Sequence, residues 1–224
     1  MNSLRSLLKQ SELFEDIPGK ALEQFILPHG RLQEYQKDQF LIVPRQQVDS
    51  IGFVVSGKIH ILHLFENGSH SLMSVLSSGS FLGVDLVCTP SQLAPYHAMA
   101  ASAAQVFHLP AGLFFNPGHM DETLRFRCLE RMLALVANEN MKKEYRLAIL
   151  SQNNLRNRIM TYLSMQARKR NETSFSIPFS REEMASFLCV NRSALSHELS
   201  LMRQEGLISF RKNEFTLHHW NPDR

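Results

Sequence analysis

The stretch SREEMASFLCVNRSALSHELSLMRQEGLI, Ser180–Ile208, carries the most specific pattern in the chain. Its first four residues, Ser180-Arg181-Glu182-Glu183, are typical of a capping box and predict the start of a helix. That helix is expected over Arg181–Leu188. After an interruption at Cys189-Val190-Asn191, a longer helix is expected from Arg192 to about Glu205. Two helices with this separation predict a helix-turn-helix.

The second of these helices has one apolar side and one side of short polar residues. Leu195, Leu199 and Met202 recur at helical spacing, and Leu188 and Ala185 supply the facing surface of the first helix. The side chains left over point outward from the first two turns, the part of such motifs that meets base edges in the major groove. They are Asn191, which is the expected N-cap, and Arg192, Ser193, Ser196 and His197.

The residues after this helix predict a basic wing. Gly206 ends the helix, because glycine tolerates the left-handed conformation that helix ends adopt. SFRKNEFTL is then typical of a hairpin with Arg211-Lys212-Asn213-Glu214 at its tip. Arg211, Lys212 and also Arg181 are expected to contact DNA phosphates.

A long helix is predicted ahead of this motif, from Asp121 to Leu150, where the chain has neither proline nor glycine. Such a helix extends about 40 Å, which is more than a small barrel covers. Its second apolar stripe therefore needs a partner, and a parallel copy of itself is the simplest one. A helix folded back on its own domain is the alternative. A further helix is expected over Leu155–Arg168.

The segment from Phe40 to about Leu109 predicts an antiparallel barrel or jelly roll. Its pieces IGFVVSG, KIHILHLF and SLMSVLSSG are rich in β-branched and aromatic residues and are expected as strands. Glu66-Asn67-Gly68 supplies a hairpin turn between the last two pieces. Closure into a roll follows from several short strands broken by turn residues.

Composition indicates a globular protein, and the distribution of charge is compatible with a nucleic-acid partner. Of the 224 residues, 44% are hydrophobic. Residues 151–224 hold 11 Lys and Arg against 7 Asp and Glu, whereas residues 1–150 hold 13 against 14, so the positive excess lies in the C-terminal third. No signal-peptide core or membrane-spanning apolar run is present, and a cytoplasmic protein without a membrane partner is expected.

In this order, the segments resemble the Crp/Fnr family of bacterial transcription regulators over nearly the whole chain. The matching motifs are the stretch quoted first, together with VVSGKIHIL and SSGSFLG in the roll. The resemblance implies an α+β protein: a cyclic-nucleotide-binding-like β-roll sensor (1–120), a dimerisation helix (121–150) and a winged helix-turn-helix (151–224). It further implies a homodimeric, non-enzymatic regulator that binds an inverted-repeat operator in double-stranded DNA and contacts RNA polymerase.

The recognition helix departs from the family pattern. The family's Arg-Glu pair and a further Arg four residues after that Glu correspond to Arg192, Ser193 and His197, so only the first residue is retained. Arg192 can bind guanine O6 and N7 bidentately. Ser193 cannot copy the reach of a carboxylate, and His197 lacks the fork of an arginine. An operator unlike the family's best-known half-site is expected.

The resemblance does not extend to the cyclic-nucleotide ligands. The family's ribose-binding Glu corresponds to Val84, and its phosphate-binding Arg-Ser pair corresponds to Ala94-Pro95. No Lys or Arg occurs between Lys58 and Arg125 to neutralise a phosphate. Cyclic AMP is therefore not expected as the effector.

An uncharged or weakly polar small molecule is expected instead, bound between the roll and the long helix. Asp85, Tyr96 and His97 are its polar candidates. The full candidate set is Gly83, Val84, Asp85, Leu86, Pro95, Tyr96 and His97 from the roll with Leu129, Met132 and Val136 from the helix. A filled roll in a constitutive regulator is the alternative.

Other cofactor chemistries find less support. The three cysteines are dispersed, so neither an iron–sulfur cluster nor a zinc site is expected, and buried free thiols are the default for all three. Haem with His97 or His108 as axial ligand, and redox chemistry at Cys88, stay open. A cupin metalloenzyme is disfavoured because His60 and His63 would point to opposite faces of one strand.

Overall fold

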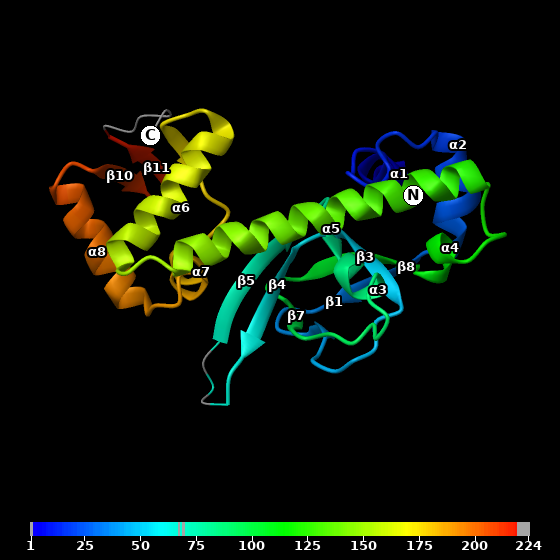
Figure 1. Cartoon of the computed structure of the whole chain (residues 1–224), viewed down its shortest axis with the longest axis horizontal. Coiled ribbons are helices and arrows are strands. Elements are labelled where there is room, and N and C mark those ends of the chain that lie inside the picture. The colour runs from blue at the N-terminus through cyan, green and yellow to red at the C-terminus, as the bar shows by residue number, and fades with distance from the viewer. Residues whose placement is uncertain (1, 67, 69, 219–224) are drawn as a thin grey trace. The chain divides into compact units, whose positions relative to one another are not determined.

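The computed structural model describes residues 2–66, 68 and 70–218 (Figure 1). The chain divides into two compact units, one of Met1–Gly68 with Met73–Asn140 and one of Ser69–Leu72 with Met141–Arg224. Both units combine antiparallel strands with helices. The predicted α+β class is confirmed.

Two four-stranded sheets dominate the first unit, with strand orders β1-β8-β3-β6 and β2-β7-β4-β5. The pairs β1/β8, β8/β3, β3/β6, β2/β7 and β7/β4 are antiparallel, as a β-roll requires. The strands are β1 (Arg31–Tyr35), β2 (Phe40–Ile42), β3 (Ser50–Ser56), β4 (Lys58–Leu64), β5 (His70–Ser77), β6 (Phe81–Leu82), β7 (His97–Ala100) and β8 (Ala104–Pro110).

The three strand segments predicted from the sequence correspond to β3, β4 and β5 within one or two residues. The apolar run of β3 has no polar alternation because this strand lies between two others in its sheet and is buried over most of its length. Of the predicted turn Glu66-Asn67-Gly68, Gly68 has φ +78° and donates its N–H to the Phe65 carbonyl at 2.9 Å. Asn67 lies outside the described residues.

Gly57 alone joins β3 to β4 and has φ +84°, a conformation that favours glycine. A Cβ atom at this position would lie 2.3 Å from the Ala103 carbonyl oxygen and 2.7 Å from the Ala104 Cα. Both atoms belong to backbone, which cannot give way by a rotamer change. The glycine therefore satisfies two requirements, one conformational and one steric.

We expect Gly57→Ala to lower the free energy of unfolding by about 1–3 kcal/mol more than Gly79→Ala does, because the clash adds to the strain. Gly79 is the matched control: it has φ +90°, and a Cβ atom there would meet nothing within 4 Å. Urea unfolding of the two variants measures the difference. Equal losses would show that the backbone around Ala103 relaxes without cost.

Short helices cover further parts of the first unit and were not predicted. Leu8, Leu13 and Phe14, near the N-terminus, are fully buried in the same core as the strands. These elements are α1 (Asn2–Lys9), α2 (Gly19–Ala21), η1 (Leu22–Ile26), η2 (Leu27–His29), α3 (Val84–Val87) and α4 (Gly112–Phe115).

The long helix α5 spans Glu122–Leu150, 29 residues, as predicted from the absence of proline and glycine (Figure 1). The Asp121 carboxylate caps it by accepting hydrogen bonds from the N–H groups of Thr123 and Leu124 at 3.0 and 3.1 Å. Leu124, Cys128 and Met132 on one side of the helix are buried in the core of the first unit.

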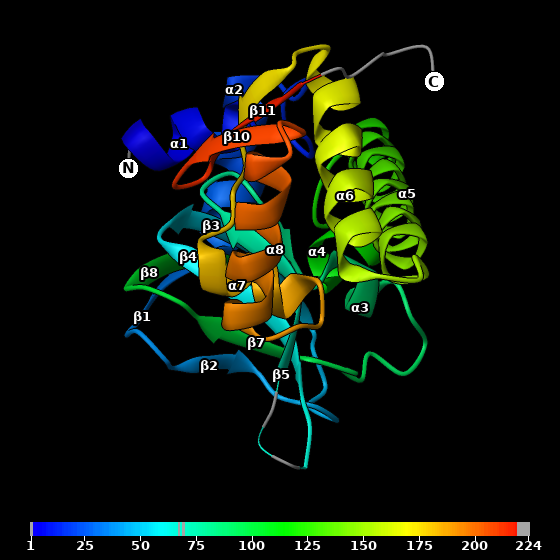
Figure 2. The same ribbon diagram turned by 90° about the vertical axis from the view of Figure 1, so that its left-hand side faces the viewer.

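The described residues of the second unit form three further helices and a three-stranded antiparallel sheet (Figure 2). Its elements are α6 (Leu155–Arg170), β9 (Ser174–Ser176), α7 (Arg181–Phe187), α8 (Arg192–Gln204), β10 (Ile208–Arg211) and β11 (Glu214–Leu217). The sheet has the order β10-β11-β9. Ile159 and Leu163 of α6 are fully buried, and so are Leu195 and Leu199 of α8. The predicted helix over Leu155–Arg168 is confirmed and extends two residues further.

The prediction that all three cysteines are buried is wrong for two of them. Cys128 is buried, but Cys88 and Cys189 are exposed. Each of these two lies just after a short helix, α3 or α7, and does not face the core. Burial raises the pKa of the Cys128 thiol to about 12. Partial burial, followed by the Asp85 carboxylate, also raises the pKa of Cys88. These two thiols therefore remain protonated at neutral pH.

Candidate DNA interface

The first helix of the motif, α7, starts at the predicted capping box. The Ser180 hydroxyl accepts a hydrogen bond from the Glu183 N–H at 3.2 Å, and the Glu183 carboxylate accepts one from the Ser180 N–H at 2.6 Å. Ala185 is 3% exposed and Leu188 is fully buried. The start of α7 and its packing residues are therefore as the sequence predicts.

The turn between α7 and α8 brings the chain round in four residues. Cys189 has φ +58°, a left-handed conformation that costs a non-glycine residue about 1–2 kcal/mol. Asn191 then caps α8, because its side-chain oxygen accepts the Ala194 N–H at 2.8 Å. The turn thus fixes where α8 begins.

The outward side of α8 consists of the residues predicted from the sequence. Leu195, Leu199 and Met202 are fully buried on the opposite side. The exposed residues of the cap and first turns are Asn191, Arg192, Ser193, Ser196 and His197. The structure therefore brings all five together on one solvent-facing surface at the N-terminal end of α8.

Two of these side chains already have internal partners. The Ser193 hydroxyl donates to the Asn191 side-chain oxygen at 2.9 Å, so Asn191 serves both as helix cap and as acceptor. Ser193 keeps the lone pairs of its hydroxyl oxygen available to a donor. Asn191 supports the geometry of the first turn through this pair of contacts.

The wing is a two-residue hairpin held firmly at its tip. Arg211 pairs with Glu214, and the turn residues are Lys212, at φ +54°, and Asn213. The Asn213 side chain donates to the Ile177 carbonyl at 3.0 Å, and the Ile177 N–H donates to the Asn213 carbonyl at 2.9 Å. Arg211 and Lys212 themselves are exposed. Their charges are therefore presented on a fixed backbone.

Arg181 has an internal role that the sequence did not indicate. Its guanidinium carbon lies 4.9 Å from the ring centre of Phe210 and 5.6 Å from that of Phe215, and it donates to the Lys212 carbonyl at 3.2 Å. Burial lowers the pKa of Arg181, and the charge of Arg192 lowers it further. Arg181 thus stacks under the wing while contributing to the same positive field as Arg192.

Arg203 was missed from the sequence. It is exposed on α8, and its guanidinium carbon lies 5.2 Å from the ring centre of Phe210 in β10. Its position eleven residues after Arg192, close to three helical turns, places both on one side of α8 and was the available signal. Arg203 therefore connects the recognition helix to the wing.

The predicted effector residues lie in the first unit, and most of them are packed. Val84, Leu86, Tyr96 and Met132 belong to one buried cluster. Leu129 and Val136 of α5 are partly buried against the same cluster. Pro95, in contrast, is exposed. The structure thus brings the apolar candidates from the roll and from α5 together.

The polar candidates have distinct environments. The Tyr96 hydroxyl donates to Asp85 Oδ1 at 3.1 Å. Burial, the Asp85 carboxylate and then Glu139 raise the pKa of Tyr96 well above its ordinary value. The His97 ring packs 5.4 Å from that of Phe40, and its Nδ1 is buried without a hydrogen-bond partner among the described residues. Glu139, which the sequence did not single out, thus adds negative charge near Tyr96.

Neither cyclic-nucleotide position offers a charge. Val84 and Ala94 are buried apolar residues, and Pro95 has no donor. His108, a candidate haem ligand, has its Nε2 2.9 Å from the Tyr35 hydroxyl oxygen. Burial, followed by Arg31, lowers the pKa of His108, so its imidazole is neutral. Haem ligation through Nε2 would require this contact to break.

The described residues do not form a metal centre. Within this part of the chain, no group of three or more His, Cys, Asp or Glu side chains is arranged to hold a metal ion. No helix in the same part combines the length and the apolarity needed to cross a membrane.

Comparison with known proteins agrees with this geometry. Residues 157–221 match the family model described as a Crp-like helix-turn-helix domain, and residues 32–116 match that of the cyclic nucleotide-binding domain. The anaerobic regulatory protein of Pasteurella multocida (strain Pm70) is 20% identical over 193 residues, which cover 84% of this chain and 68% of that protein.

Two solved structures share the fold. FixK2 from Bradyrhizobium japonicum has a TM-score of 0.66 and 17% identity, covering 87% of this chain and 94% of its own. The c-di-GMP responsive global regulator CLP of Xanthomonas campestris has a TM-score of 0.69 and 15% identity, covering 91% and 100%.

A β-roll, a long helix and a winged helix-turn-helix, in this order, define a DNA-binding transcription regulator. The two family models match the modules of the fold in order and identify a Crp/Fnr-type regulator, as the resemblance to that family implied. The family is one of transcription regulators rather than enzymes.

Proposed function

We propose that the protein is a homodimeric regulator that binds an inverted-repeat DNA site through α8 and the wing. The observation that carries this proposal is the exposed surface of Asn191, Arg192, Ser193, Ser196 and His197 at the N-terminal end of α8. Short polar side chains allow a helix to approach base edges closely, and one arginine supplies a strong donor.

Individual roles follow from chemistry and placement. Arg192 is assigned to guanine, because its guanidinium can donate to O6 and N7 together. Ser193, Ser196 and His197 are assigned shorter base or phosphate contacts. Arg211 and Lys212 are assigned to phosphates, which they reach from the fixed tip of the wing. Arg181 adds positive charge while it supports the wing.

Dimerisation is proposed through the side of α5 that faces away from the core of the first unit. Phe126, Leu133 and Leu147 are 64%, 71% and 62% exposed and fall on a seven-residue repeat with Asn140. Leu129 and Val136, three residues after members of this repeat, lie beside it but are partly buried against the core of the first unit. Apolar residues at such spacing, with one asparagine, are typical of a parallel two-stranded coiled coil.

The proposed effector is a small molecule other than a cyclic nucleotide, bound among the packed residues around Tyr96, with Gly83, Asp85 and His97 beside them. The buried Nδ1 of His97 supports a neutral hydrogen-bonding ligand. Asp85 and Glu139 near Tyr96 disfavour an anion. A constitutive regulator is the second candidate, favoured by the membership of Val84, Leu86, Tyr96 and Met132 in one core cluster.

The cellular setting follows from the DNA target. Because a regulator of this type acts on chromosomal DNA, the proposal includes a location in the bacterial cytoplasm and RNA polymerase as a further partner. Residues 1–120 are assigned to sensing, 121–150 to dimerisation and 151–224 to DNA binding.

The test of the proposal is selection of duplexes from a random library with the full-length protein, followed by sequencing. We expect an inverted repeat whose half-sites lie about one helical turn apart, because two-fold symmetry sets that spacing. Enrichment of asymmetric sequences, or no enrichment, would contradict it.

We further expect cyclic AMP, cyclic GMP and cyclic di-GMP each to leave the affinity for the selected duplex unchanged within about twofold, because Val84, Ala94 and Pro95 offer no cation to pair with a phosphate. Fluorescence anisotropy measures the effect at nucleotide concentrations from about 1 μM to about 1 mM, so that dissociation constants across this range would be detected. A saturable increase in affinity with any of the three would overturn the effector assignment.

A further inference from the structure

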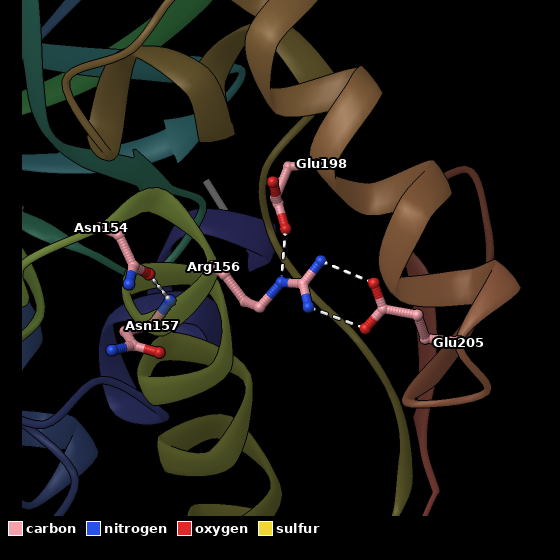
Figure 3. Close-up of polar contacts among 5 residues, drawn as sticks. All are labelled: Asn154, Arg156, Asn157, Glu198 and Glu205. Carbon is pink, nitrogen blue, oxygen red and sulfur yellow. Dashed lines mark hydrogen bonds and ion pairs between the residues drawn. The ribbon is translucent and has the colours of Figure 1, made fainter.

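Arg156, in the first turn of α6, joins α6 to the recognition helix (Figure 3). Its Nε donates to Glu198 at 2.6 Å, and its two terminal nitrogens donate to the two oxygens of Glu205 at 2.7 and 2.8 Å. One guanidinium therefore makes three hydrogen bonds to carboxylates that lie seven residues apart. This contact uses the planar fork of arginine, which lysine cannot reproduce.

The two acceptors mark one flank of α8. Glu198 lies within α8 and Glu205 is its C-cap residue, so they are about two turns apart on the side that meets α6. Arg203, between them in sequence, instead lies over Phe210 of the wing. The recognition helix is therefore held on one flank by Arg156 and on the other by the wing, with its outward residues between.

The backbone that carries Arg156 lies in a capped helix turn. The Asn154 side-chain oxygen caps α6 by accepting the Asn157 N–H at 2.8 Å (Figure 3). Because Arg156 lies between these two residues, its backbone belongs to an ordered first turn. The hydrogen bonds of Glu205 and then of Glu198 raise the pKa of Arg156.

We propose that Arg156 is a positioning residue for DNA recognition: it sets the orientation of α8 by holding Glu198 and Glu205, so that the outward residues meet base edges in register. The inference rests on the proposed function. It predicts that Arg156 governs discrimination between sequences, although it lies on the flank of α8 and not on its outward side.

The exposure of these side chains and the geometry of their contact distinguish a positioning role from a contribution to the stability of the whole fold. The three side chains are 36%, 20% and 46% exposed, and ion pairs at such exposure contribute little to global stability. A bidentate contact does restrict geometry, because both parallel bonds must be satisfied together. Base readout depends on side-chain placement within about 0.5 Å, whereas contacts to phosphates tolerate more movement.

The experiment compares Arg156→Met with the matched control Arg170→Met. Arg170 lies at the other end of α6 and donates its hydrogen bonds to Gln166 and the Ser176 carbonyl rather than to α8. Binding of each full-length variant to the selected operator and to a scrambled duplex is measured, together with its thermal unfolding.

For Arg156→Met we expect about tenfold weaker operator binding, roughly the discrimination that one displaced base contact supplies, with little change in binding to the scrambled duplex or in Tm. Arg156→Lys should recover only part of the loss. Arg170→Met should leave the ratio of the two affinities unchanged. Equal weakening on both duplexes would overturn the inference, since it would indicate simple charge neutralisation. Unchanged operator binding, or a loss that follows Tm, would also overturn it.

A measurement without DNA keeps the inference separate from the proposed function. Hydrogen exchange of the amides of Leu199–Gln204 should be faster in Arg156→Met than in Arg170→Met, because α8 loses its hold on α6. Equal exchange would contradict the positioning role. Absence of sequence preference in the wild-type protein, with this difference in exchange present, would instead contradict the proposed function alone.

Discussion

Leu133→Arg is expected to convert the protein from a dimer to a monomer and to reduce operator binding more than a hundredfold. Leu133 is 71% exposed on α5 and occupies the middle of the proposed coiled-coil stripe. Each leucine buried at such an interface contributes about 1.5–3 kcal/mol, and the dimer contains two copies. An arginine in its place adds like charges that face each other across the two-fold axis.

Light scattering at micromolar concentration measures the mass, and anisotropy measures binding to the selected duplex. The matched control is Leu32→Arg, which changes another exposed leucine, 48% accessible, on β1 of the roll. The control should remain dimeric with unchanged affinity. A dimeric Leu133→Arg variant would place the interface elsewhere. A wild-type monomer, with and without DNA, would remove the proposal of a homodimer.

Arg192→Ala is expected to abolish the preference for one base pair at a symmetric position of each half-site. A bidentate contact to guanine contributes about 1–3 kcal/mol of discrimination, so the two half-sites together lose about 2–6 kcal/mol. The outward position of Arg192 in the first turn of α8, beyond the cap at Asn191, supports this assignment. Binding to duplexes with single symmetric substitutions measures the preference.

Lys212→Ala provides the contrast for this measurement. Lys212 is exposed at the tip of the wing, so its loss should weaken all sequences alike and reduce the salt slope by about 1 for each phosphate contact removed. If Arg192→Ala also lost affinity uniformly, with the base preference intact, Arg192 would bind a phosphate and another residue of α8 would contact the base.

The boundaries of the helix-turn-helix could be predicted from the sequence because they depend on local contacts. The capping box joins residues three apart, Ser180 and Glu183, and the cap at Asn191 likewise binds the N–H three residues on. The wing turn at Lys212 was predicted as part of a four-residue tip. Such signals need no knowledge of the rest of the chain.

The sequence predicted two apolar stripes on α5 but did not show which of them faces the core. Periodicity predicted that the helix has more than one apolar side. It did not show that Leu124, Cys128 and Met132 face the core of the first unit, or that Phe126 and Leu133 remain exposed. Both sets have helical spacing, and only packing against the roll distinguishes them. The prediction that Cys88 and Cys189 are buried was wrong for the same reason, because only the packing of the folded chain decides which cysteines reach the core.

The sequence by itself determined the order of the modules, the approximate limits of α5 to α8 and the outward residues at the N-terminal end of α8, because hydrogen bonds within a few residues and apolar periodicity encode these features. Only the tertiary structure decided the partners of three charged or polar groups. Arg156 meets Glu198, 42 residues away, Arg181 stacks on Phe210, and Glu139 approaches Tyr96. Such partners are set by how helices and sheets pack, and a side chain's own neighbours in the chain carry no record of that packing.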